Sequence, residues 1–361
     1  MYAEERRNVN FAIAGLGGIG RVHAISAYAA NMTLNLPYNL NLVKTYTRRP
    51  AQGSVNGTKN TQDLDEAVND KNIDFIDICT PNDSHMDIVK AAAHAGMPIY
   101  CEKPLSSSCK EAEEMTRLVK EAGIKNAVAL IYRFVPAVRL IKEELEEGTI
   151  GEIIDFKIKL YHKSYLDSNK KGVWRTKAAS GGGALLDLGI HLIDIIHFTM
   201  GEVEKVKAES RIFFEDRTSV DEISNCELHL ENGIRGNLEV SRVFADKEES
   251  TTFVVYGTKG SLRMTSADSM NIEIYDFNKN ISYIKSAKGN KNILKYYGGS
   301  TMGFFYDSHK ASIVNFAEII LGKEVEEGLT PTFEDGLKAQ RVVEACYKSS
   351  REKREVNIEE I

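Results

Sequence analysis

The sequence predicts an α/β protein: a doubly wound parallel sheet at the N-terminus, followed by an α+β domain with a large, mostly antiparallel open sheet. Three observations support this fold class. Short β-rich runs alternate with amphipathic segments in the first third of the chain. A glycine-rich motif at residues 15–20 joins an apolar run to a helical pattern. After Phe134 many strand-like segments follow one another without helices between them. A chain of 361 residues suits two domains, which we place at 1–133 and 134–361.

The first domain is expected to alternate strands and helices. Expected strands cover residues 8–15, 40–47, 73–80, 98–102 and 126–132, and expected helices cover 19–30, 62–69, 84–95 and 107–122. Such alternation implies right-handed crossovers between parallel strands. Sheets of this kind bind ligands beyond the carboxyl ends of their strands, so we expect the functional residues at that edge.

The second domain follows a different pattern. We expect a helix at 135–147 and a long strand at 152–163, followed by a Gly-rich segment at 181–183 that opens a helix. Further strands are expected at 203–214, 226–230, 236–240, 253–257, 261–265 and 271–277. Two helices at 305–321 and 333–349 then precede a terminal strand. Turn signals such as Glu231-Asn232-Gly233 separate the strands. A sheet with helices on one face leaves the other free to pair, so we expect a homodimer or homotetramer.

The net charge of −6 argues against a nucleic-acid partner or an anionic membrane surface, because either needs a basic footprint. The five cysteines form no close pair and are odd in number, which is typical of reduced intracellular thiols. The first ten residues contain no apolar core of a signal peptide, and no apolar stretch approaches membrane-spanning length. We therefore expect a cytoplasmic protein without a membrane segment.

The motif Gly15-Leu16-Gly17-Gly18-Ile19-Gly20 satisfies G-x-G-x-x-G in the required context, after a strand and before a helix. Gly15 permits the tight turn, Gly17 lets the backbone approach a pyrophosphate, and Gly20 allows the helix to pack closely on the strand. The helix N-terminus then offers N–H groups to the phosphates. We expect a Rossmann dinucleotide-binding domain in which the whole turn, including Gly18 and Ile19, contacts the cofactor.

The end of the second strand bears on the choice between NAD and NADP. An NAD enzyme usually places Asp or Glu there to accept from the ribose 2′-OH, but this chain has Thr47-Arg48-Arg49. A 2′-phosphate could sit between Thr47 and the guanidinium of Arg48, since no carboxylate repels it. The alternative is a solvated basic turn that leaves NAD acceptable. The sequence favours NADP over NAD.

The apolar run Pro98–Cys101 ends abruptly in Glu102-Lys103-Pro104. Lys103 would lie at the carboxyl edge, where the nicotinamide of a bound dinucleotide is expected. Pro104 restricts Lys103 to extended geometry, and the bond between them is a candidate cis bond. The alternative is a pair of surface charges at the end of a strand. The apolar character of the strand favours a functional lysine.

A second candidate lies in GGGALLDLGIHLIDIIHF, residues 181–198. If this segment is helical, Asp187 and His191 are four residues apart and share a buried face, where they need a partner or a task. An alternative is a metal site formed by Asp187 and His191 with Asp194 or His197. His197 lies on another face and no H-x-x-x-H pair is present, so we expect no metal. Among the other histidines, His23 and His85 are expected to be structural or to line the cofactor, and the remainder to be structural: His94, His162, His229 and His309.

At this point the motifs resemble those of the Gfo/Idh/MocA oxidoreductases, over essentially the whole chain. The matching segments, in order, are AGLGGIGRVHA (14–24), CTPNDSH (79–85), CEKPLS (101–106), WRTKAASGGGALLDLGIHLID (174–194) and PTFEDGLKAQRVVEACYKS (331–349). One motif alone is weak, but several in order are specific.

The resemblance implies roles for particular residues. Lys103 would contact the reacting hydroxyl and the nicotinamide ribose, Asp187 would position the substrate, and His191 would be the general acid/base. The residues expected to line the cofactor are Thr80, Pro81, Asn82, His85 and Glu102, while Trp174 and Arg175 would border the nicotinamide or the substrate, and Tyr132 and Arg133 the substrate side. Thr47 departs from the Asp that many members carry, which puts NAD specificity in doubt.

The expected activity is reversible hydride transfer between NAD(P) and a hydroxyl-bearing carbon of a sugar, cyclitol or sugar derivative. Two alternatives keep the bound dinucleotide. One is an NAD-dependent glycosidase that acts by transient oxidation and elimination. The other is a non-catalytic regulator, which has little reason to keep Lys103, Asp187 and His191 together.

Overall fold

The computed structural model describes residues 7–49, 55, 57–170, 176–177, 180–247, 250–298 and 300–361. These residues form two compact units. The first contains the described residues up to Ser106 together with Lys110–Ile131 and Lys295–Gly336, and the second contains Ser107–Cys109, Tyr132–Leu294 and Leu337–Ile361. The units differ from the predicted division at 133/134, because residues 295–336 return to the first unit after the chain has passed through the second.

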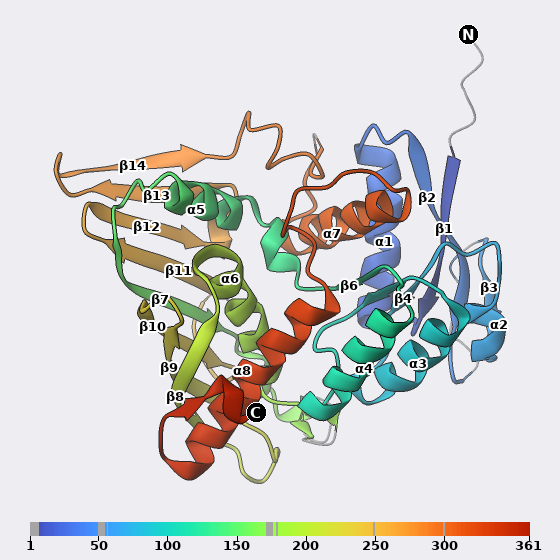
Figure 1. The fold of residues 1–361 in the computed structure, drawn as a ribbon, viewed down its shortest axis with the longest axis horizontal. Helices are drawn as coiled ribbons and strands as arrows, with labels where there is room; N and C mark the ends of the chain where they lie inside the picture. The colour runs from blue at the N-terminus through green and yellow to red at the C-terminus, as the bar shows by residue number, and fades with distance from the viewer. Residues whose placement is uncertain are drawn as a thin grey trace. The chain divides into compact units, whose positions relative to one another are not determined.

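The first unit is built on a six-stranded sheet in which every pairing is parallel. Its strands are β1 (Arg7–Ala14), β2 (Tyr38–Tyr46), β3 (Lys59–Thr61), β4 (Phe75–Ile78), β5 (Ile99–Cys101) and β6 (Asn126–Val128). The order is β3-β2-β1-β4-β5-β6, so the direction of winding reverses beside β1 (Figure 1). This reversal is the point at which doubly wound sheets bind ligands, and it confirms the predicted fold of the N-terminal part.

Helices cover both faces of this sheet, as its buried strands require. They are α1 (Gly18–Thr33), α2 (Leu64–Val68), α3 (His85–Ala95), α4 (Cys109–Glu121) and α7 (Phe304–Ile320). Helix α7 packs beside α1, although most of the second unit lies between these two helices in the sequence (Figure 1). Phe316 of α7 contacts Phe75 and Tyr100, with ring centroids 5.3 Å and 5.7 Å apart. Burial of these aromatic rings accounts for the return of α7 to the first unit.

The second unit is built on a nine-stranded mixed sheet. Its strands are β7 (Ile153–Tyr161), β8 (Val203–Arg211), β9 (Ile223–Leu230), β10 (Arg235–Ser241), β11 (Ser250–Gly257), β12 (Gly260–Thr265), β13 (Asn271–Asp276), β14 (Ile281–Ser286) and β15 (Val356–Asn357). The order is β14-β13-β12-β11-β7-β10-β9-β8-β15. Only β7 and β10 are parallel; the other pairings are antiparallel, as predicted. Strand β14 was not expected, because the side chains of its first four residues are exposed and show no apolar alternation.

Helices α5 (Pro136–Glu146) and α6 (Ile190–Met200) and the part of α8 (Phe333–Glu352) from Leu337 onward cover this sheet. Along β7, Phe156, Ile158 and Leu160 are buried, while Lys157 and Lys159 between them are exposed. This period of two means that the helices cover one face only.

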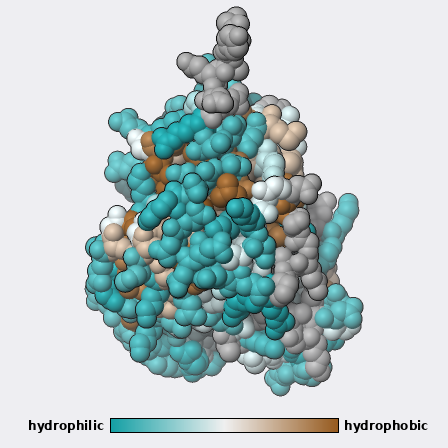
Figure 2. Space-filling view, turned by 90° about the vertical axis from the view of Figure 1, so that its right-hand side faces the viewer, coloured by the Kyte–Doolittle hydropathy of each residue, from teal (hydrophilic) through white to brown (hydrophobic). Residues whose placement is uncertain are grey.

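None of the helices in the described part of the chain is long and apolar enough to cross a membrane. Figure 2 shows a face of the molecule on which hydrophilic residues predominate and hydrophobic ones form small, separate patches.

Candidate active site

The glycine-rich turn follows β1 and is fixed by two close approaches. Gly15 has φ of +96°, and a Cβ there would lie 2.8 Å from the carbonyl oxygen of Cys79. A Cβ on Gly20 would lie 2.1 Å from the carbonyl oxygen of Gly15. The first glycine therefore supplies the left-handed backbone and the last lets α1 approach β1.

The middle of the turn is open in the way a phosphate requires. Gly17 and Gly18 are exposed, and nothing lies within 4 Å of a Cβ at either position. Helix α1 begins at Gly18, and no side chain caps its N-terminus. Beside the turn, the Thr80 hydroxyl oxygen is buried and has no hydrogen-bond partner among the described residues. The uncapped helix terminus and the orphaned hydroxyl fit a dinucleotide that donates and accepts hydrogen bonds there.

The end of β2 lies directly against this turn. The Gly15 N–H donates to the Tyr46 carbonyl at 2.9 Å, and the Thr47 N–H donates to the Thr61 carbonyl at 3.1 Å. The Thr47 hydroxyl accepts from the Asn60 amide at 3.1 Å. Arg48 and Arg49 follow and are exposed. The predicted recognition residues for the ribose thus adjoin the phosphate turn.

The loop after β4 carries Thr80, Pro81 and Asn82, and His85 opens α3 behind it. Both ring nitrogens of His85 lie 2.9 Å from carbonyl oxygens, Nδ1 from that of Leu105 and Nε2 from that of Thr80. Burial lowers the pKa of His85. The imidazole therefore ties the loop after β4 to the segment after β5. A cofactor contact by His85 stays a prediction.

The charged pair after β5 is partly turned inward. Glu102 is buried and Lys103 is half-buried, and the Lys103–Pro104 bond is cis. The Lys103 N–H donates to Glu102 Oε2 at 3.1 Å. Glu102 is therefore not a surface charge. The strand ends in a buried, hydrogen-bonded carboxylate, in agreement with the apolar run before it.

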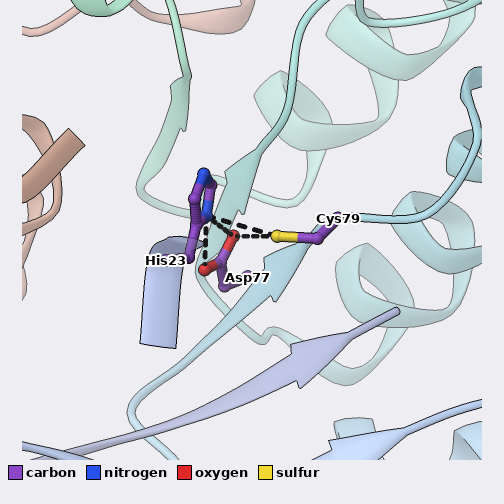
Figure 3. Close-up of side chains that lie close together, drawn as sticks. All are labelled: His23, Asp77 and Cys79. Atoms are coloured by element: carbon purple, nitrogen blue, oxygen red, sulfur yellow. Dashed lines mark hydrogen bonds and ion pairs between the residues drawn. The ribbon is translucent and has the colours of Figure 1, made fainter. Parts of the chain in front are cut away.

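The partner of Glu102 is His23, on the second turn of α1. Figure 3 shows the contacts of His23 with Asp77 and Cys79. His23 Nε2 donates to Glu102 Oε1 at 2.9 Å, and Nδ1 donates to Asp77 Oδ2 at 2.8 Å. The Cys79 sulfur lies 3.2 Å from Nδ1 and 3.3 Å from Asp77 Oδ1. All of these side chains are buried.

The charges in this cluster determine its pKa values. Burial alone would lower the pKa of His23, but the Asp77 carboxylate, with smaller contributions from Cys79, raises it well above the usual value. Burial alone would raise the pKa of Glu102, but the hydrogen bond and charge of His23 lower it to about 2. Both directions favour a charged His23 beside an ionised Glu102.

His309 of α7 also belongs to this cluster, which no pattern in the sequence indicates. Its ring centroid lies 4.8 Å from that of His23, and Nδ1 is buried without a hydrogen-bond partner in the described structure. Burial, aided by the charge of His23, lowers the pKa of His309 to about 3, so this imidazole is neutral. The pattern G-x-G-x-x-G-x-x-H could have drawn attention to His23, but no spacing connects it to a residue on α7.

In the second unit, a π-helical turn, Leu185–Gly189, leads into α6 and holds Asp187. Its start depends on Gly183, which has φ of +121° and whose Cβ would lie 2.3 Å from Asp221 Oδ1. The Leu185 N–H donates to Asp221 Oδ2 at 2.8 Å, and the Tyr347 hydroxyl donates to Oδ1 at 2.8 Å. Asp221 therefore anchors the turn, and burial raises the pKa of its carboxyl group.

Asp187 and His191 are both buried, in agreement with a shared face of a buried helix. The Asp187 carboxylate forms an ion pair with Arg242, whose guanidinium also donates to the Ser164 hydroxyl at 3.1 Å. Arg242 directly follows β10 and was missed, although an arginine at the end of a half-buried strand is a recognisable signal. Its positive charge balances the negative charge of the buried Asp187 carboxylate.

His191 packs against Tyr132, with ring centroids 5.0 Å apart. The Tyr132 hydroxyl lies 3.0 Å from that of Thr251, and burial raises the pKa of Tyr132 to about 12. Arg133, the other residue expected on the substrate side, is buried and donates to Asp194 from Nη2 at 2.6 Å and from Nε at 3.0 Å. This ion pair joins Arg133 to α6, and a substrate contact by Arg133 stays a prediction.

The protein contacts of the possible metal ligands Asp187, His191, Asp194 and His197 bear on whether they could bind an ion. Arginines pair with both carboxylates, and the His197 Nε2 accepts from the Val203 N–H at 3.4 Å. Among the described residues of the first unit, two groups of ligand-type atoms lie within 4.8 Å of one another: His23, Asp77 and Cys79, and His23, Glu102 and His309. The predicted cofactor or substrate residues Trp174 and Arg175 lie outside the described residues.

The fold and the glycine turn define a two-domain, dinucleotide-binding α/β protein, and comparison with known proteins identifies its family. Residues 9–130 match the model "Oxidoreductase family, NAD-binding Rossmann fold", and residues 142–358 match "Oxidoreductase family, C-terminal alpha/beta domain". The chain belongs to this family, the Gfo/Idh/MocA oxidoreductases. The predicted family and enzyme class are therefore confirmed.

Named relatives cover most of the chain. Levoglucosan dehydrogenase of Pseudarthrobacter phenanthrenivorans is 30% identical over 71% of this chain and 73% of its own. Inositol 2-dehydrogenase of Rhizobium meliloti is 27% identical over 97% of this chain and 99% of its own. Among solved structures, an NAD binding oxidoreductase from Klebsiella pneumoniae has a TM-score of 0.87 at 28% identity, covering 97% of this chain and 99% of its own. Levoglucosan dehydrogenase in complex with NADH and levoglucosan has a TM-score of 0.87 at 25% identity, covering 98% of this chain and 100% of its own.

Proposed function

We propose that this protein transfers a hydride between a nicotinamide dinucleotide and a hydroxyl-bearing carbon of a sugar, cyclitol or sugar derivative. The observation that supports this most is the position of Lys103. It follows β5 at the carboxyl edge of the same parallel sheet whose β1 ends in the glycine turn. Relatives named as dehydrogenases of levoglucosan and inositol supply the substrate class.

The residues that would hold the dinucleotide are those of the glycine turn, with Thr80, Pro81, Asn82, His85 and Glu102 along the same edge. When bound, the nicotinamide supplies the hydride acceptor or donor. We favour NADP over NAD, since Thr47 stands where a carboxylate would repel a 2′-phosphate and the Arg48 guanidinium suits a phosphate.

We assign the proton chemistry to His191 and Lys103. His191 takes the proton of the substrate hydroxyl in oxidation and returns it in reduction, because an imidazole exchanges protons near neutrality. The Lys103 ammonium stabilises the negative charge that develops on the substrate during hydride transfer. Asp187 positions the substrate, and Arg242 keeps the Asp187 carboxylate ionised through their ion pair.

A panel of polyols and aldoses, assayed separately with NAD and NADP, tests this function. The expected result is substrate-dependent reduction of the dinucleotide, seen at the absorbance band of the reduced nicotinamide. Release of sugar from glycosides without net reduction would instead support the glycosidase. Tight dinucleotide binding without turnover on any polyol, aldose or glycoside would contradict both enzymes.

Substitutions test the assigned residues once a substrate is known. Lys103→Ala and His191→Ala should abolish turnover while the dinucleotide still binds. Lys120→Ala and His94→Ala are the controls, because both side chains are exposed and lie away from the proposed site. Near-full activity of either site variant would overturn its assignment.

We also propose a homodimer or homotetramer that assembles through the sheet face without helices. Light scattering coupled to size-exclusion chromatography tests this assembly. A monomer at micromolar concentration would contradict it.

A further inference from the structure

His23 connects two parts of the first unit that bind different portions of a dinucleotide. It lies three residues after Gly20 on α1, so the helix that starts at the phosphate turn also carries the imidazole. The ring is fully buried, and it reaches Asp77 on β4 and Glu102 after β5.

Each contact requires a proton on the ring. Asp77 and Glu102 accept hydrogen bonds as carboxylates, so both Nδ1 and Nε2 of His23 donate. Two buried carboxylates without a cation would be costly, and the imidazolium supplies one between them. The Glu102 carboxylate connects His23 to the Lys103 backbone, because its other oxygen accepts from the Lys103 N–H at 3.1 Å.

The other titratable groups that face this ring leave its charge in place. His309 of α7 is neutral, since burial lowers its pKa to about 3. Burial raises the pKa values of Cys79 and Tyr100 well above neutrality, so both stay uncharged. The Lys103 cation also lies near Glu102.

We propose that His23 is a positioning residue of the hydride-transfer site: it holds the Glu102 carboxylate, and through it the Lys103 backbone, in register with the phosphate turn. This inference rests on the proposed function. It explains why a charged pair follows a fully buried short strand: Glu102 is hydrogen-bonded inward, while Lys103 is held at the edge of the sheet.

The same atoms resemble a metal site, but the hydrogen bonds favour a proton. An ion bound to either group of ligands would need one of the His23 nitrogens that already donates to a carboxylate. Elemental analysis of the purified holoprotein is expected to find less than one-tenth of an ion per chain. A transition metal at one ion per chain, retained on dialysis and lost in His23→Gln, would overturn the proposal.

A pair of uncharged variants separates positioning from charge alone. The amide nitrogen of Gln can occupy the place of Nε2 and still donate to Glu102, while that of Asn occupies the place of Nδ1 and donates only to Asp77. We expect His23→Asn to lower kcat by about 10- to 100-fold, the loss typical of a hydrogen bond to a charged group, and His23→Gln to lower it by about 3-fold or less. His94→Gln is the control, since His94 is exposed on α3. Equal losses in the two His23 variants, or a larger loss in His23→Gln, would overturn the proposal.

A spectroscopic readout keeps the test independent of folding and of turnover. In wild-type protein labelled with 15N-histidine, both His23 ring nitrogens should carry protons at neutral pH. In amide spectra of the variants, the Lys103 signal should move in His23→Asn and stay near its wild-type position in His23→Gln. An unprotonated ring nitrogen in the wild type would overturn the proposal. If no polyol or aldose is oxidised, the proposed function fails, while these spectra still decide whether His23 positions Lys103.

Discussion

His23 Nε2 lies 2.9 Å from Glu102 Oε1, although 79 residues separate the two in the chain. One residue belongs to the helix of the phosphate turn, and the other precedes the proposed catalytic lysine. Parallel strands bring the two together, since β1, β4 and β5 are neighbours whose carboxyl ends meet at one edge. The cofactor turn and the lysine segment are therefore parts of one hydrogen-bonded structure.

The His23–Glu102 pair predicts how stability depends on pH. The folded pKa of His23 is raised, so its contribution to the free energy of unfolding is complete below about pH 6.5 and falls as the pH rises through the folded value. The pKa of Glu102 is lowered to about 2, so its contribution is complete above the unfolded pKa and is lost as the pH falls toward 2. Urea unfolding across this range should show both losses, and His23→Gln should lack the alkaline one. If the free energy of unfolding of the wild type instead rose relative to that of His23→Gln as the pH increased above 7, the prediction would be wrong.

The two ends of the glycine turn should respond differently to a methyl group. Gly20→Ala should lower the free energy of unfolding by about 1–3 kcal/mol and weaken dinucleotide binding, because its Cβ would overlap the Gly15 carbonyl oxygen at 2.1 Å. Gly18→Ala is the matched variant for stability: nothing lies within 4 Å, so unfolding should change by about 0.5 kcal/mol or less. Chemical denaturation and dinucleotide fluorescence measure the two effects. Equal destabilisation by both variants would show that α1 does not depend on this close approach.

The Asp187–Arg242 ion pair should appear in the pH profile of the enzyme. Arg242→Met leaves a buried carboxylate without its cation, which should raise the pKa of Asp187 and move the acidic limb of kcat/KM to higher pH. At neutral pH we expect kcat/KM to fall by about 10- to 100-fold. Arg263→Met serves as the control, because that side chain is exposed on β12. An unchanged profile would remove Asp187 from the proposed substrate site.

Cofactor choice should follow the residue after β2. Thr47→Asp places a carboxylate where NAD enzymes bind the ribose 2′-OH, so it should weaken NADP binding and favour NAD. Arg48→Ala should weaken NADP binding by about 1.5–3 kcal/mol, because the variant loses a charge-assisted hydrogen bond to the 2′-phosphate. The dissociation constant of NAD should change by about threefold or less, because NAD has no 2′-phosphate. Dissociation constants for both dinucleotides, with Lys71→Ala as the surface control, measure the difference. Equal changes for the two cofactors would contradict recognition by this turn.

Local patterns were sufficient for much of the architecture. The strand at 98–102 and the helix at 84–95 correspond to β5 and α3, because their boundaries are marked by Gly96 and by prolines. The return of α7 to the first unit was not visible in the sequence. Its amphipathic pattern predicts a helix, but tertiary contacts such as those of Phe316 with Phe75 and Tyr100 select the sheet that it covers.

The same distinction applies to the charged residues. The sequence placed Asp187 and His191 on one buried helical segment, because a spacing of four residues is a local property. It did not reveal Arg242, which lies just after β10, 55 residues beyond Asp187 in the chain. Nor did it connect His23 with Glu102 or His309.

By itself, the sequence determined the fold class, the dinucleotide turn and the family, since these depend on periodicity, glycine sterics and motifs read along a short stretch of chain. Only the tertiary structure decided which buried charges are partners. The physical reason is that a carboxylate removed from water must find its cation or donor across strands and helices, and that choice is made by sheet order and packing rather than by neighbours in sequence.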